Sequence, residues 1–101
     1  MHKNALFYMA NLHPELGRMA SFFETGKLEA GHNSRVRALG IVDNILASGE
    51  INSAGREEWN VIKNFILGFE HLDGYEKKIL SKYAEPFAFK FMNSYATQNR
   101  E

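Results

Sequence analysis

Glu29 and His32 are the two side chains whose spacing comes closest to a metal-binding motif, since Glu-x-x-His is the repeat of carboxylate di-iron bundles. Such a centre needs the motif twice, together with two further carboxylates on helices that face inward. The chain has the motif once, in a stretch that Gly31 marks as a connector. One carboxylate and one imidazole supply neither the ligand number nor the geometry that selects a metal. The sequence therefore predicts no metal site and no cofactor.

Residues 47–58 invite comparison with the calcium loop of EF-hand proteins. Counting from Glu50, Gly55 occupies the sixth position, where such a loop needs glycine. The twelfth position is Val61, where the loop needs a carboxylate. The calcium interpretation therefore fails, and the segment weakly resembles the helix–Gly-x-Ile-x-x–acidic–helix hairpins found in several unrelated bundle families.

Motifs for catalysis are missing from the sequence. The absence of cysteine excludes disulfides, thiolate zinc sites and cysteine nucleophiles, and there is no glycine-rich phosphate loop or Gly-x-Ser-x-Gly elbow. Asp43 is the one carboxylate that we expect to be partly buried, and burial raises a carboxyl pKa. A lone buried carboxylate is usually a structural partner, so we expect no enzyme. A small-ligand binder or enzyme with a pocket near Asp43, Tyr75 or Tyr83 is an alternative hypothesis.

A second alternative is a DNA-binding regulator that uses a basic patch of Arg18, Lys27, Arg35 and Arg37. The twelve Lys and Arg of the chain balance its twelve Asp and Glu, which leaves no long-range field to attract nucleic acid or an anionic membrane. A helix-turn-helix with its turn at Gly49 would also begin its recognition helix near two consecutive glutamates, which phosphates repel. Nucleic acid is therefore a disfavoured partner.

Length and composition predict a single helical domain over residues 1–101. The chain is 45% hydrophobic and 13% aromatic, which is too rich for a disordered protein. No window approaches the roughly 20 apolar residues of a membrane span. The apolar start of the chain has no small-residue cleavage pattern. We expect a cytoplasmic protein that does not enter the membrane.

The clearest element is a helix over residues 52–72, capped by Asn52 or Ser53. Its apolar arc spans nearly half the circumference, so it must contact several neighbours. The arc comprises Trp59, Val61, Ile62, Phe65, Ile66, Phe69 and Leu72. A helix over about residues 34–48 precedes it and ends at Gly49. Because the link is short, the helices at about 34–48 and 53–72 are predicted to form a central αα-hairpin.

The N-terminal part leaves two alternatives open. Residues 4–12 are apolar on all sides of a helix, and Pro14 either separates them from a second helix or kinks a single one. Gly26 is a suitable residue to follow the helix end, and residues 27–33 are predicted to be a connector.

In the C-terminal part, Asp73 and Glu76 form a predicted capping box. The helix that follows has an apolar stripe of Tyr75, Ile79, Leu80 and Tyr83. Pro86 interrupts it, and we expect a further helix rather than a strand beyond this proline. The whole pattern predicts an all-α bundle of four to six helices.

More apolar surface is present than a bundle of this size can easily cover, and exposed apolar patches mark interaction surfaces. Our main hypothesis is a small protein-interaction module, an adaptor, inhibitor or accessory factor, that forms a homodimer or binds another protein. Aromatic residues and methionine are enriched at such surfaces. The predicted interface residues are Leu6, Phe7, Met9, Leu67, Phe87, Phe89, Phe91 and Tyr95.

Overall fold

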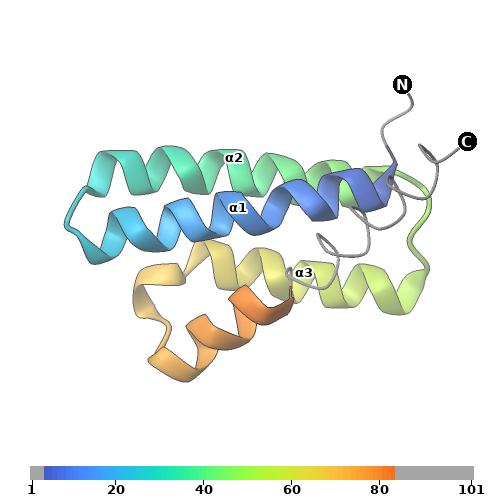
Figure 1. Ribbon diagram of the computed structural model, residues 1–101. Coiled ribbons are helices and arrows are strands. Elements are labelled where there is room, and N and C mark those ends of the chain that lie inside the picture. The colour runs from blue at the N-terminus through green and yellow to red at the C-terminus, as the bar shows by residue number, and fades with distance from the viewer. Residues whose placement is uncertain (1–3, 84–101) are drawn as a thin grey trace, which may run out of the picture.

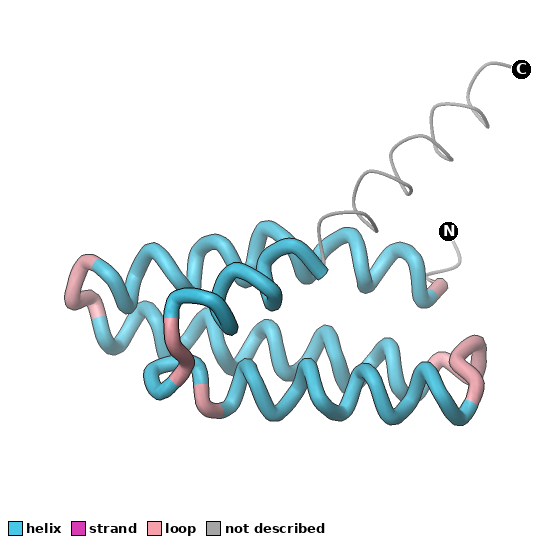
Figure 2. Tube along the Cα trace, turned by 90° about the horizontal axis from the view of Figure 1, so that it is seen from below, coloured by secondary structure: helices cyan, strands magenta, loops and turns pink. Residues whose placement is uncertain are grey.

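The chain folds into a bundle of antiparallel helices, shown in Figure 1. The computed structural model describes residues 4–83. The elements in chain order are α1 (Ala5–Glu24), α2 (Leu28–Ala47), α3 (Ser53–Leu67) and the short 3-10 helix η1 (Phe69–His71). A further helix over residues 74–83 lies beside them (Figure 2), and the described residues include no strand. The prediction of an all-α bundle is confirmed.

Pro14 lies inside α1, which continues as one helix from Ala5 to Glu24. Proline removes one backbone donor and is normally unfavourable inside a helix. Leu12 and Leu16 are nevertheless 0% and 4% exposed on either side of it. Because the buried face continues across the proline, core packing holds both halves in one helix. The structure therefore excludes the alternative of two separate helices.

The start of α2 at Leu28 corrects the prediction of a connector over residues 27–33. The turn from α1 is short and contains Gly26 at a φ of +77°. Gly31 serves packing rather than a turn, because a Cβ at this position would lie 2.8 Å from the Phe23 ring. Gly31 lowers the helix propensity of α2 locally, but its lack of a side chain lets α1 and α2 approach each other.

The hairpin between α2 and α3 forms as predicted, although its helices have different bounds. Gly49 has a φ of +76°, a conformation that suits glycine at the turn. The Asn52 side chain caps α3, with its Oδ1 accepting a hydrogen bond of 2.8 Å from the backbone N–H of Gly55. Local signals therefore located the link correctly.

The end of α3 differs from the prediction of one helix over residues 52–72. The helix ends at Leu67, and Gly68 follows with its N–H donating to the Asn64 carbonyl at 3.0 Å. The chain then turns into η1, which places Phe69 in the core at 3% exposure. A continuous helix would direct the following residues away from the bundle, so the break lets the chain return against it.

The helix over residues 74–83 begins with the predicted capping box. The Asp73 side chain accepts a hydrogen bond of 2.8 Å from the Glu76 backbone N–H, and the Glu76 side chain accepts one of 3.0 Å from the Asp73 N–H. Leu80 is 2% exposed, and the Tyr83 ring packs edge-on against Trp59 with 5.3 Å between centroids. The segment after Pro86 lies outside the described residues.

The core lies where α1, α2 and α3 meet and is closed by η1 and the 74–83 helix. Its largest fully buried apolar side chains are Leu12, Met19, Val42, Ile45, Ile66 and Leu80. Trp59 and Ile62 of the predicted α3 arc are buried, but Val61 is 50% exposed. The buried part of α3 is therefore narrower than its apolar arc, because α3 has bundle neighbours on only part of its circumference.

Candidate functional site

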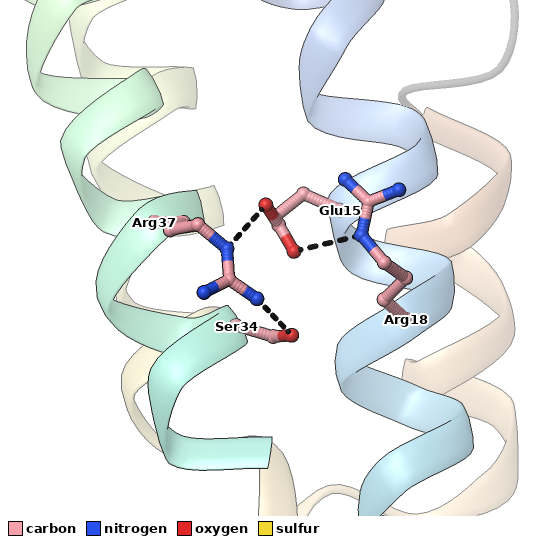
Figure 3. Close-up of polar contacts among 4 residues, drawn as sticks. All are labelled: Glu15, Arg18, Ser34 and Arg37. Carbon is pink, nitrogen blue, oxygen red and sulfur yellow. Dashed lines mark hydrogen bonds and ion pairs between the residues drawn. The ribbon is translucent and has the colours of Figure 1, made fainter. Parts of the chain in front are cut away.

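Glu15 is the most deeply buried ionisable residue described, at 4% exposure. Its two carboxylate oxygens accept hydrogen bonds from Nε of Arg18 at 3.1 Å and from Nε of Arg37 at 2.9 Å (Figure 3). Arg37 also donates from Nη2 to the buried Ser34 hydroxyl at 3.0 Å. The cluster joins α1 to α2. Sequence reasoning missed Glu15, although its position between Leu12 and the other buried residues of α1 was a signal.

The environment of Glu15 keeps its carboxylate ionised. Burial raises the pKa of Glu15, but the hydrogen bonds and positive charges of Arg18 and Arg37 outweigh it and hold the pKa below its ordinary value. The two guanidinium groups direct their outer nitrogens away from each other in Figure 3, so they do not converge on one anion. The cluster is therefore suited to clamping two helices, and it lacks the near-neutral pKa of a general acid or base.

The four residues of the predicted nucleic-acid patch do not form one surface. Arg18 and Arg37 meet at Glu15, as described above. Arg35 turns toward the end of α3, where it donates to the Leu67 carbonyl at 3.0 Å and pairs with Glu70. Lys27 lies in the turn between α1 and α2. Three of the four cations thus have a carboxylate partner within the bundle.

Asp43 is exposed, which corrects the expectation of partial burial. Its side chain is 57% exposed and accepts a hydrogen bond of 2.8 Å from the Lys63 ammonium, so that it links α2 to α3 at the surface. Asp43 shares a face of α2 with the exposed residues Val36, Gly40 and Ala47, which explains its exposure. Asp43 lines none of the described hollows.

The predicted interface residues are distributed over both ends of the bundle. Leu6 and Phe7 are partly buried near the start of α1, and Met9 is 8% exposed and belongs to the core. Leu67 is 48% exposed at the end of α3, which is the opposite end of the bundle (Figure 1). Phe87, Phe89, Phe91 and Tyr95 lie outside the described residues.

The outer face of the 74–83 helix is apolar and basic. Tyr75 is 74% exposed and Ile79 is 40% exposed, whereas Leu80 of the same predicted apolar stripe is 2% exposed. They line a hollow of about 500 Å³ together with Tyr83 and two lysines. Burial raises the pKa of Tyr83 to about 12, with the charge and hydrogen bond of Glu58 adding to the effect. Tyr83 is thus anchored in the bundle, while Tyr75 faces outward.

A second hollow of about 320 Å³ lies between α1 and the 74–83 helix. Its apolar lining includes Leu16, Ala20 and Phe69. The Lys77 ammonium lies 5.0 Å from the centroid of the Phe69 ring and occupies the rim. Glu24, Lys78 and Ser81 add polar groups to the lining of this hollow.

Glu29 and His32 lie on the exposed face of α2, and within residues 4–83 no three His, Cys, Asp or Glu side chains gather as metal ligands would. None of the described helices combines the length and the hydropathy that crossing a membrane requires. Comparisons of the chain with protein-family models, with curated proteins and with solved structures find no match.

Proposed function

We propose that this chain is a small protein-interaction module that self-associates and has no catalytic role. The observation that supports this proposal most directly is the exposure of Leu67 and Leu28, at 48% and 58%. Leu28 begins α2 at one end of the bundle, and α3 ends at Leu67 in the half of the bundle nearer to that end (Figure 1), where Arg35, about two turns after Leu28, donates to the Leu67 carbonyl. We call Leu28 and Leu67 the leucine end.

The electrostatics of the leucine end favour contact with a second copy. Arg35 donates to the Leu67 carbonyl and pairs with Glu70, and Glu70 lines a hollow of about 270 Å³ together with Leu28. Because the charges of Arg35 and Glu70 cancel, this ion pair adds no net charge beside the two leucines. Two copies that meet here would therefore bury apolar surface without bringing like charges together.

A stable interface buries about 800 Å² on each partner, which two leucines cannot provide alone. We propose that they act as central contacts, because a few residues contribute most of the binding free energy of an interface. A net charge of zero leaves little long-range repulsion between copies. The lack of cysteine fits the reducing cytoplasm, where we propose that the protein acts.

Light scattering over a concentration series tests the proposal on the full chain. We expect a dimer for the wild type and a folded monomer for Leu28→Glu with Leu67→Glu. Val61→Glu is the matched control, because Val61 is 50% exposed on α3 but faces elsewhere. Surface substitutions of this kind change folding stability by only about 0.5 kcal/mol. A wild type that remains monomeric at every concentration would refute self-association.

A further inference from the structure

The outward side of the 74–83 helix carries two parallel rows of side chains. Tyr75 and Ile79 are four residues apart and form an apolar row, and Lys78 and Lys82 repeat the same spacing beside it. Residues at i, i+3, i+4 and i+7 share one face of a helix. All four are exposed, and all four line the hollow of about 500 Å³. We call these four residues the Tyr75–Lys82 face.

Other residues of this helix fix it to the bundle. Leu80 is 2% exposed, and Tyr83 packs against Trp59. The capping box of Asp73 and Glu76 holds the first turn. The Tyr75–Lys82 face is therefore presented by a helix whose orientation is already set, which lowers the entropy lost when a partner binds.

The charges on this helix are predominantly positive. Lys77 lies over the Phe69 ring, and the one acidic residue of the helix, Glu76, is engaged in the capping box. Neither Lys78 nor Lys82 forms an ion pair with any residue in the described part of the chain, and no acidic side chain from that part lines the hollow. The two ammonium groups are available to a partner.

We propose that the Tyr75–Lys82 face binds an amphipathic helical segment of another protein, in which a row of acidic side chains runs beside a row of apolar ones. The apolar row would pack on Tyr75 and Ile79, and the carboxylates would pair with Lys78 and Lys82. This surface is separate from the leucine end, so the inference goes beyond self-association.

Two other occupants fit the face less well. A second copy of the chain would bring the lysine rows of both copies together, which opposes a symmetric contact. A membrane surface is normally bound by an amphipathic helix with a continuous apolar face, whereas residues 74–83 expose two large apolar side chains, Tyr75 and Ile79. The paired rows match the groove-type recognition of an amphipathic helix.

The test uses the full chain and two labelled 18-residue helical peptides. One peptide carries a leucine row beside a glutamate row, and the other has lysine at every glutamate position. Fluorescence anisotropy should show at least tenfold tighter binding of the acidic peptide, with weaker binding at higher salt. Lys78→Glu with Lys82→Glu should reverse the preference between the peptides.

Lys27→Glu with Arg56→Glu is the matched control, because it changes the net charge equally at exposed positions on other elements. The preference for the acidic peptide should persist in that variant. Ile79→Ser should weaken binding of the acidic peptide while circular dichroism remains unchanged, since Ile79 is not part of the core.

Equal binding of both peptides, or binding of neither, would overturn the proposal. Tighter binding to phosphatidylserine vesicles than to the acidic peptide would assign the face to a membrane instead. A dimer that dissociates in the Lys78→Glu, Lys82→Glu variant would assign it to a second copy. Loss of the dimer at the leucine end leaves the peptide result unaffected, so the two proposals can fail separately.

Discussion

The guanidinium group of Arg35 lies over the Phe23 ring, 5.0 Å from its centroid. The Nη1 and Nη2 atoms of the same guanidinium group donate to the Leu67 carbonyl and to the Glu70 carboxylate. Phe23 in turn stacks on Phe69, with 5.8 Å between centroids and 28° between planes. One arginine on α2 thus joins the end of α1 to the end of α3 and to η1.

Replacement of Arg35 by alanine should destabilise the protein by roughly 2–3 kcal/mol, because it removes a charge-assisted hydrogen bond to a backbone carbonyl, an ion pair and a cation–π contact. Arg35→Lys keeps the charge but lacks the fork geometry and should be intermediate. Urea denaturation measures the free energy of unfolding of both variants and of the wild type. A loss below about 0.5 kcal/mol in the alanine variant would show that these contacts contribute little.

Gly31→Ala should destabilise the protein by about 1–2 kcal/mol, because the new Cβ would lie 2.8 Å from a Phe23 ring that Arg35 and Phe69 hold in place. Gly40→Ala, on the same helix, meets open space and should stabilise by about 0.5–1 kcal/mol through helix propensity. Thermal unfolding of the two variants gives the comparison. Equal effects of the same sign would contradict the close approach of α1 and α2.

Glu15→Gln should destabilise the protein by roughly 2 kcal/mol at pH 7, because two arginines lose their shared carboxylate. The folded-state pKa of Glu15 is lowered, so its contribution is fully present above the ordinary value of 4.5 and is lost as the pH falls below it. The difference between the wild type and the variant should therefore shrink as the pH falls below 4.5. Glu29→Gln removes a carboxylate at an exposed position on α2 and is the control, with an expected change of at most about 0.5 kcal/mol at pH 7.

The phenol of Tyr83 should lose its proton only at strongly alkaline pH. Its pKa is raised to about 12 from 10.0, so the protonated phenol contributes stability that is present below pH 10 and is lost as the pH rises toward 12. We expect the stability difference between the wild type and Tyr83→Phe to narrow over this range. Absorbance at alkaline pH provides a second measurement, since the variant should lack the phenol that ionises near pH 12. An unchanged late component in Tyr83→Phe would contradict the assignment.

Three signals that act over a few residues were interpreted correctly, although the connector predicted over residues 27–33 was wrong. Asn52 caps α3, Asp73 and Glu76 form the capping box, and Gly49 adopts a positive φ in the link. Each depends on a side chain meeting a backbone group within a few positions along the chain. Such contacts form in much the same way in any helical context, so the sequence predicts them reliably.

The candidate surfaces were predicted only in part. Leu67 was expected at an interface and is exposed, but Leu28, which is also exposed, was assigned to a connector. Tyr75 and Ile79 were assigned to one apolar stripe with Leu80, but they are exposed and Leu80 is buried. Apolar periodicity identifies a helix face without showing how much of that face its neighbours cover, so it cannot separate core from exposed surface.

The sequence by itself determined the all-α class, the caps and the turn at Gly49, because helical period and capping are local properties. Three features depend on the tertiary structure. Helix α1 continues through Pro14, Gly31 lies inside a helix, and Glu15 is buried between two arginines. In each case the local preference of the residue opposes the outcome. Packing between α1 and α2 overrides that preference, since burial of a shared core stabilises more than one unfavourable residue costs.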